Sequence, residues 1–285
     1  MNFRLSPFRL FIYATLILFG LVYLAPIYVM IVTSLKDLDE IRRGNMLALP
    51  ESASTAAWFK AWSTACIGLT CEGISSYFIN SVKMAVPAVL ISTIFGALNG
   101  YVLTKFRFKG DRLFFGLLLF SCFIPFQAIL IPMATVLGKI GLSDSIAGLV
   151  LVHFTYGIGF TSLFFRNYYH AFPDELINAA KIDGAGFFKT FLRILLPASG
   201  PIIVISVIWQ FTNIWNDFLF GASFTSGANS PVTVALNNLV NSSTGVKEYN
   251  VDMAAAIYAA LPTLLIYILA GKYFVKGLLA GSVKG

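Results

Sequence analysis

The sequence contains little charge. Only 12% of its 285 residues are Asp, Glu, Lys or Arg, whereas 58% are hydrophobic. A typical soluble domain carries about 25% charged residues. This composition excludes an ordinary soluble domain and favours a protein whose solvent is the lipid bilayer.

The sequence also lacks the residues that most enzymes use. No glycine-rich loop ends in Gly-Lys-Ser or Gly-Lys-Thr, so the chain is not expected to hydrolyse ATP by itself. Its two histidines, His153 and His170, have no cluster of carboxylates beside them, which argues against a metal site. The apolar runs contain no constellation of acid, base and nucleophile, so an intramembrane enzyme is not supported. We expect no catalytic residues, no metal and no cofactor bound by this chain.

Cysteine is scarce. Cys122 falls within an apolar run, where a buried inert thiol is expected. Cys66 and Cys71 lie together in a polar stretch that the topology below places outside the cell, and Gly68 between them eases a tight turn. From the sequence, a disulfide and a pair of free thiols are equally supported.

Apolar runs long enough to cross a bilayer are what the sequence does contain. A membrane helix needs about 20 mostly apolar residues, and prolines inside it are tolerated where neighbours satisfy the backbone. The first run is too long for the core of a signal peptide and lacks a small-x-small cleavage site, so we expect it to be retained. The expected fold is an all-α membrane protein with six transmembrane helices, over about residues 10–35, 78–104, 113–138, 145–166, 195–221 and 252–275.

The distribution of Lys and Arg predicts the orientation, because short basic loops stay in the cytoplasm. Thirteen basic residues fall on one side if residues 1–9 are inside, whereas the other side holds six basic residues balanced by eight acidic ones. Both termini are therefore expected to be cytoplasmic. The net charge of +7 is explained by this topology and gives no reason to expect nucleic-acid binding.

Two long segments are expected outside the cell. In the first, Trp58 and Trp62 are four residues apart on an expected short helix, which suits either the membrane interface or the docking of a partner. In the second, residues 223–250, turns surround Pro231 and a short helix is expected near residues 232–240. Both segments are candidates for contact with an external protein.

A short cytoplasmic helix is predicted between the fourth and fifth transmembrane helices. Pro173 suits the first helical turn, Asp174 and Glu175 suit the positive end of the helix dipole, and Gly184 suits its C-terminal cap. Apolar and small residues recur at a spacing of three and four, and the alanines permit close approach by another surface. This segment, within the cytoplasmic loop 167–197, has the features of a docking helix.

The same segment resembles the EAA loop of ABC-importer permeases. That pattern runs Glu-Ala-Ala, two residues, Asp-Gly-Ala, then a Leu-Pro and a further proline. One position departs from it, because Asn178 stands where the family usually has Glu, which removes a charge; Glu175 lies one turn earlier. The matching residues are Ala179, Ala180, Asp183, Gly184, Ala185, Pro197 and Pro201.

Further matches along the chain are similar to the carbohydrate branch of these permeases, which includes the maltose-type permeases. The tail 277–285 looks like the one that such permeases insert between two ATPase subunits. The other matches are Asn80-Ser81, Gly100-Tyr101, Phe106 to Gly110, Pro125, Gln127, Pro132, Gly141-Leu142 and Trp215-Asn216-Asp217.

The resemblance implies the type I fold of ABC-importer permeases and a role as one permease subunit in the bacterial inner (cytoplasmic) membrane. The partners that it implies are a second homologous permease, two ATPases that use ATP and Mg, and a periplasmic sugar-binding protein. The residues that would couple to the ATPases are Glu175, Asn178, Ala179, Ala180, Asp183, Gly184, Ala185 and Lys284.

Polar residues inside the apolar runs are candidates for the sugar path, because charged side chains there normally face the bundle interior. Asn213, Trp215, Asn216 and Asp217 combine hydrogen-bonding groups with an indole ring that suits a sugar. The alternative is that Asp217 reaches interfacial water or pairs with the second permease. His153 is expected to be a packing residue, and Asn99 either lines the pore or bridges two helices.

An ion-coupled secondary transporter is the alternative function. It would need intramembrane carboxylates or paired charges for its coupling ion. Asp217 is the one carboxylate available for this, and the docking segment would then have no purpose. The transported sugar is not readable from the sequence.

Overall fold

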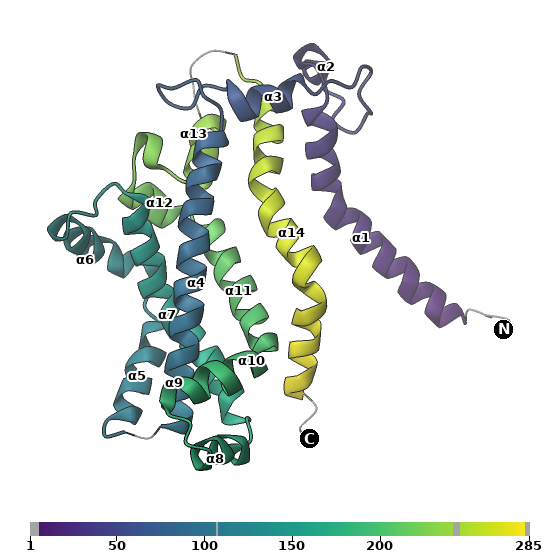
Figure 1. Cartoon of the computed structure of the whole chain (residues 1–285). Helices are drawn as coiled ribbons and strands as arrows, with labels where there is room; N and C mark the ends of the chain where they lie inside the picture. Colours follow the sequence, from purple (N-terminus) through teal and green to yellow (C-terminus); the bar gives the residue numbers. More distant parts are fainter. Residues whose placement is uncertain (1–5, 107, 242–245, 283–285) are drawn as a thin grey trace. The chain divides into compact units, whose positions relative to one another are not determined.

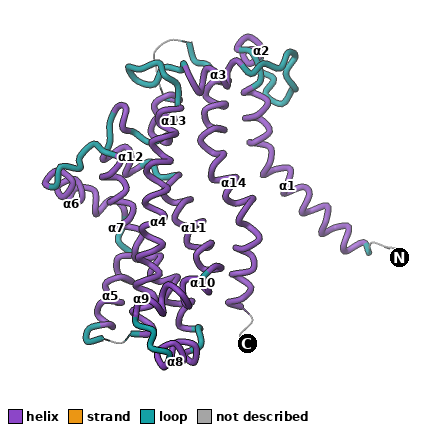
Figure 2. The backbone as a smooth tube through the Cα atoms, in the orientation of Figure 1, coloured by secondary structure: helices purple, strands orange, loops and turns teal. Residues whose placement is uncertain are grey.

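The computed structural model describes residues 6–106, 108–241 and 246–282, with side chains up to residue 271. These residues are helical apart from turns and loops, and the one β-bridge among them joins Ile67 and Thr70 (Figure 2). The chain divides into two compact units, one of residues 1–75 and 236–260 and one of residues 76–235 and 261–285. The expected all-α class is confirmed.

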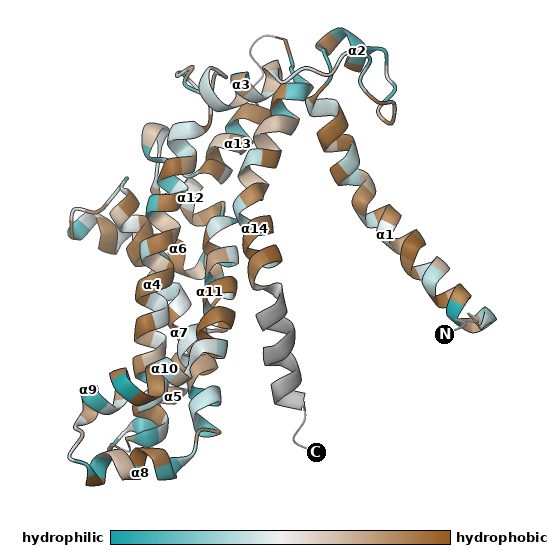
Figure 3. Cartoon of the chain, turned by 45° about the vertical axis from the view of Figure 1, so that its right-hand side comes forward, coloured by the Kyte–Doolittle hydropathy of each residue, from teal (hydrophilic) through white to brown (hydrophobic). Residues whose placement is uncertain are grey.

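The first unit begins with α1 (Pro7–Ser34), which is mostly hydrophobic, as the colouring in Figure 3 shows. Its apolar side chains are largely exposed. The Ser6 hydroxyl caps this helix by accepting the Arg9 N–H. Two short helices follow, α2 (Leu38–Arg42) and α3 (Ala56–Ser63). An apolar surface of this length is stable in lipid and not in water, which is what the composition predicted.

Trp58 and Trp62 of α3 both pack on an aromatic ring of their own unit. Their ring centroids lie 5.1 Å and 5.0 Å from that of Tyr258. The indole N–H of Trp58 also donates to the Ser34 hydroxyl at 3.1 Å. The two tryptophans thus hold the end of α1 and α14 (Tyr249–Ser282) against α3, a contact that neither of the two sequence interpretations included.

The second unit is built on the contact of α4 (Ser75–Lys105) with α7 (Ile146–His170) (Figure 1). A Cβ atom added to Gly96 would lie 2.5 Å from the Thr161 Cβ, and one added to Gly100 would lie 2.6 Å from the Phe165 Cβ. These glycines, four residues apart, let the two backbones approach closely. Asn99 between them donates to the Ser162 hydroxyl at 2.9 Å, so it bridges two helices.

The expected helix over residues 113–138 is broken in the structure. It consists of α5 (Asp111–Ser121) and α6 (Phe126–Lys139), which meet at 106°. Pro125 stands at the start of α6, and the Tyr156 hydroxyl donates to the carbonyl oxygen of Ile124 at 3.0 Å. The break is stable because a side chain of α7 satisfies a carbonyl that the bend leaves without a helical partner.

The expected helix over residues 195–221 is also not continuous. The chain runs through α9 (Phe187–Thr190), a π-helix (Phe191–Leu195) and α10 (Leu196–Ala198), then bends by 79° into α11 (Gly200–Trp215). It ends six residues before the expected position, and α12 (Leu219–Phe224) and the predicted short helix α13 (Val232–Val240) follow. At the bend, the hydroxyls of Tyr168 and Tyr169 bond the Ala198 carbonyl and the Ser199 hydroxyl, both at 2.8 Å.

By length and apolar composition, four helices of the described residues can cross a membrane, and six spans result if each bent pair counts as one. The four are α1, α4, α7 and α14, each within a few residues of the expected bounds. The two bent pairs lie where the third and fifth spans were expected.

Candidate functional site

The cytoplasmic helix predicted from the sequence is α8 (Asp174–Ile182). Its C-terminal end carries a paired cap, because the Gly184 N–H donates to the Lys181 carbonyl at 3.0 Å and the Ala185 N–H donates to the Ala180 carbonyl at 2.8 Å. Gly184 has φ +74°, a left-handed conformation that favours glycine, and no atom lies within 4 Å of the Cβ that another residue would add. The glycine is therefore required by the backbone and not by crowding.

The N-terminal end of α8 is tied to α4. Lys105, the last residue of α4, donates to the Asp174 carboxylate at 2.6 Å and to the Phe172 carbonyl at 2.7 Å. The neighbouring ammonium group lowers the pKa of the Asp174 carboxyl below its ordinary value, through the hydrogen bond first and the charge second. Sequence reasoning did not identify Lys105, because its partners lie almost seventy positions away in the chain.

The predicted coupling residues do not all face outward. Ala180 is buried, and its neighbour Ile177 belongs to the core cluster that contains Tyr101, Phe165 and Phe191. Ala185 is half-buried. The residues that are exposed are Glu175, Asn178, Ala179, Asp183 and Gly184, whereas the side chain of Lys284 lies outside the described residues, as does that part of the tail 277–285. The two adjacent alanines thus differ: Ala179 lies on the exposed surface of α8, and Ala180 faces the interior.

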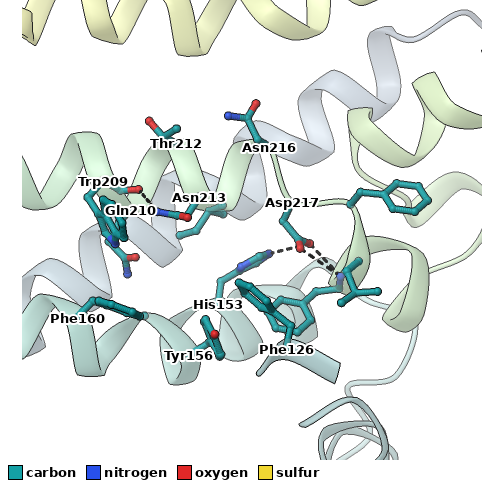
Figure 4. A pocket seen from close by; sticks show the side chains of 15 residues that line it. Phe126, His153, Tyr156, Phe160, Trp209, Gln210, Thr212, Asn213, Asn216 and Asp217 are labelled. Carbon is teal, nitrogen blue, oxygen red and sulfur yellow. Dashed lines mark hydrogen bonds and ion pairs between the residues drawn. The ribbon is translucent and has the colours of Figure 1, made fainter. Parts of the chain in front are cut away.

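A second feature is a cavity of about 630 Å³ between α7, α11 and α12 (Figure 4). Asn213, Asn216 and Asp217 from the predicted sugar path line it, together with Trp209 and Gln210. Trp215 does not, because it is 1% exposed and packs its ring on Phe78 and Phe211. One helical step turns Trp215 into the core, so it does not line this cavity, and its place on the sugar path stays a prediction.

Asp217 has a structural task in this cavity wall. Its carboxylate accepts the backbone N–H groups of Phe220 and Gly221, each at 3.1 Å, at the start of α12. It also faces His153, whose Nε2 lies 3.7 Å from the Asp217 Oδ2 (Figure 4). These two backbone hydrogen bonds give the carboxylate partners within its own chain.

Several lining residues were missed by sequence reasoning. His153, expected as a packing residue, is 5% exposed and packs on the Phe220 ring, and it also borders the cavity. Trp209, which was missed, lies four residues before the predicted Asn213 on one face of α11, a spacing that could have been read from the sequence. Tyr156 and Phe126, stacked at 4.5 Å, come from different helices and could not.

In the first unit, the structure distinguishes between the two alternatives for the cysteines, a disulfide and two free thiols. Cys66 and Cys71 form a disulfide that closes the loop containing the Ile67 and Thr70 bridge. No group of three or more potential metal ligands occurs in the described ranges.

Membrane-length helices, a cavity among them that combines aromatic and polar side chains, and a capped helix are the features expected of a membrane permease. The sequence model of the family described as "Binding-protein-dependent transport system inner membrane component" matches residues 88–277. The chain belongs to this family, which decides against the ion-coupled secondary transporter.

Similarity to individual relatives supports the same family. The chain is 31% identical over 287 residues to the xylose/arabinose import permease protein XacI of Haloferax volcanii, with 93% of this chain and 90% of XacI covered. It is 46% identical over 188 residues to a probable ABC transporter permease protein of Pyrococcus horikoshii, with 65% of this chain and 68% of the relative covered. These are permease components of ABC importers.

The fold is similar to that of a chain in the crystal structure of a bacterial ABC transporter involved in the import of the acidic polysaccharide alginate. The TM-score is 0.81 at 19% sequence identity, and the match covers 96% of this chain and 99% of the other. At this identity the likeness shows the fold of an ABC-importer permease and nothing about the substrate.

Proposed function

We propose that this chain is one of two permease halves of an ATP-driven sugar importer in a bacterial inner membrane, with both of its termini in the cytoplasm. Relatives named for the import of xylose/arabinose, arabinooligosaccharides, diacetylchitobiose and alpha-glucosides support a carbohydrate substrate. The observation that carries the proposal is that a capped helix with an exposed face is joined by packed segments to the wall of a cavity that contains both aromatic and polar side chains.

The exposed face of α8 is the proposed surface for an ATPase subunit. Ala179 and Gly184 leave room for close approach, and Glu175, Asn178 and Asp183 supply polar groups around them. Ile182 is 86% exposed and Leu176 is 50% exposed, an apolar surface that a protein partner would cover. Asn178 would offer hydrogen bonds in place of the charge that related permeases present.

The opposite face of α8 supports transmission of movement. Ile177 packs in one buried cluster with Tyr101 of α4, Phe165 of α7, and Phe191 and Leu195 of the π-helix. The π-helix leads through α10 into α11, which carries Asn213 of the cavity wall. A displacement of α8 by a closing ATPase dimer would therefore act on the helix that lines the proposed sugar path.

The proposal includes the other subunits of such an importer. A second, homologous permease would complete the path, two ATPases would use ATP and Mg on the cytoplasmic side, and a sugar-binding protein would dock outside. In this half, Asn213, Asn216 and Asp217 would lie along the sugar path. Lys284 and the tail 277–285 are proposed to contact the ATPases.

The test is a charged obstacle on the exposed face of α8. Ala179→Arg places a long cation where the ATPase is proposed to dock, and Ala171→Arg places the same side chain at another exposed position just outside α8. With the full importer in proteoliposomes, we expect Ala179→Arg to abolish ATP-driven sugar uptake and co-purification of the ATPase, and Ala171→Arg to retain both.

Membrane insertion and yield are measured for both variants, because a folding defect would also stop uptake. Ala179→Arg protein that inserts normally, retains its ATPases and transports sugar at the unmodified rate would disprove the coupling surface. Uptake that persists when the ATPases are left out would disprove the importer itself.

A further inference from the structure

The cavity between α7, α11 and α12 contains buried polar atoms with no partner. His153 is 5% exposed and Gln210 is 3% exposed, and they come from facing helices. The Nε2 atom of each lacks a hydrogen-bond partner, and the 3.7 Å from His153 to Asp217 exceeds hydrogen-bond length. Burying such atoms unpaired is unfavourable, so turning either side chain toward the cavity would let a polar ligand complete its hydrogen bonds.

Acceptor groups lie beside these atoms. Asn213 uses its amide Nδ2 to donate to the Trp209 carbonyl at 2.8 Å, which leaves its side-chain oxygen available. The Asp217 carboxylate accepts backbone N–H groups and retains further lone pairs toward the cavity. An alternation of donors and acceptors suits hydroxyl groups, because a hydroxyl both donates and accepts.

Aromatic rings supply the apolar part of the cavity wall. Trp209 is 42% exposed, and its ring centroid lies 5.8 Å from that of Phe160. Tyr156 and Phe126 stack nearby. Figure 4 shows Trp209, Phe160, Tyr156 and Phe126 around the polar groups. Rings combined with a few placed polar groups, in about 630 Å³, suit a small ligand with an apolar face and hydroxylated edges.

The charge of the lining distinguishes between classes of sugar. Asp217 is the one carboxylate among the fifteen lining residues, and none of the fifteen is Lys or Arg. A uronate or phosphate group would enter beside this carboxylate with no cation to compensate it. Its desolvation would be unfavourable as well.

We propose that this cavity is a subsite for one uncharged sugar unit, contacted by His153, Gln210, Trp209 and Asn213, and that Asp217 rejects acidic and phosphorylated sugars. This inference rests on the proposed transport function. It deepens that function by assigning a substrate class to this half of the permease.

The first measurement probes the electrostatics of the cavity without any sugar. In a Cys122→Ser background, the thiol of N213C is labelled in the complete importer in nanodiscs. Rates are compared for a cationic trimethylammonium and an anionic sulfonated methanethiosulfonate reagent. Relative to a free thiol in solution, we expect the cation to be favoured by about tenfold, and Asp217→Asn to remove this preference.

The second measurement asks what protects the same thiol. The panel contains xylose, arabinose, maltose, diacetylchitobiose, glucuronate and glucose 6-phosphate, and each sugar is also tested for ATP-driven uptake by the unmodified complex, in which Asn213 is intact. We expect a transported neutral sugar to slow labelling of N213C severalfold, and neither anionic sugar to do so. The thiol of A171C, outside the cavity, is the control and should be labelled at one rate throughout.

The outcomes separate the two claims. Equal protection by glucuronate or glucose 6-phosphate, or their uptake, would overturn the proposed selectivity. Uptake of a neutral sugar without protection of N213C would overturn the subsite and leave the importer function intact. Failure of all ATP-driven uptake would instead overturn the proposed function, whatever the labelling shows.

Discussion

The close contact between α4 and α7 yields the sharpest prediction about stability. An alanine at Gly100 would place its Cβ 2.6 Å from the Phe165 Cβ and 2.7 Å from the Phe165 carbonyl carbon. At Gly96 the corresponding distances to Thr161 are 2.5 Å and 2.8 Å. Carbon atoms prefer separations of about 3.5–4.0 Å, so the helices would have to part by roughly 1 Å.

The loss of stability follows from the packing contacts that this separation weakens. Backbone atoms cannot rotate out of the way as a flexible side chain can, and Ala97, Tyr101 and Phe165 beside the glycines are fully buried. A gap of 0.5–1 Å already forfeits about a quarter to a half of each contact. We expect Gly96→Ala or Gly100→Ala to lower the free energy of unfolding by about 1–3 kcal/mol, the range for overpacked cores.

The double variant sharpens the argument. Once one alanine has moved the helices apart, the second meets less resistance, so the two costs should sum to more than the measured cost of both together. The Asn99 to Ser162 hydrogen bond between the two glycines should weaken in the same step.

The assay is reversible unfolding of the purified chain in mixed micelles by a denaturing detergent, followed by circular dichroism. Gly116→Ala in α5 is the matched control, because nothing lies within 4 Å of its added Cβ. It should unfold within about 0.5 kcal/mol of the unmodified protein. If Gly96→Ala and Gly100→Ala unfold together with Gly116→Ala, the close packing described here is refuted.

Four further predictions concern the ends of helices and the outer loop. Lys105→Met should speed amide exchange in α8, while Lys109→Met should not. Because Lys105 lowers the pKa of Asp174, the stabilising effect of this ion pair is present at neutral pH and is lost as the pH falls below the ordinary Asp value of 3.8. Gly184→Ala should loosen the end of α8 and reduce uptake, whereas Gly186→Ala, at φ −74°, should be neutral; equal uptake by both would contradict the role of the positive φ. Asp217→Ala should destabilise α12 by about 1–3 kcal/mol through lost hydrogen bonds, with Asp217→Asn intermediate in thermal melting, and identical melting of the two would count against the cap. Iodoacetamide should modify Cys66 and Cys71 only after reduction, so that labelling without reductant would exclude the disulfide.

Features that depend on neighbours in sequence were predictable. The ends of α8 follow from Pro173, the acidic first turn and Gly184, all within one short segment. The apolar runs predicted where helices occur, because the requirement for about 20 apolar residues acts on each run separately. The turn residues around Pro231 likewise predicted where α13 begins, and the helix was expected at residues 232–240, where it lies.

Features that depend on distant partners were not predictable. The bend at Pro125 needs the Tyr156 hydroxyl from another helix, and a proline alone does not distinguish a bend from a continuous membrane helix. From the sequence, the indole ring of Trp215 suits a sugar, whereas in the structure this ring packs on Phe78 of α4 in the core. Ala180 likewise belongs to the external motif by sequence and to the internal packing by structure.

The pair of tyrosine hydroxyls at the bend before α11 has a consequence for how the molecule can move. Tyr168 and Tyr169, at the end of α7, bond the Ala198 carbonyl and the Ser199 hydroxyl, so they tie the residues of the bend to α7. A movement that carries the bend away from α7 would break both bonds. Replacing both tyrosines by phenylalanine would remove this restraint and keep the two rings.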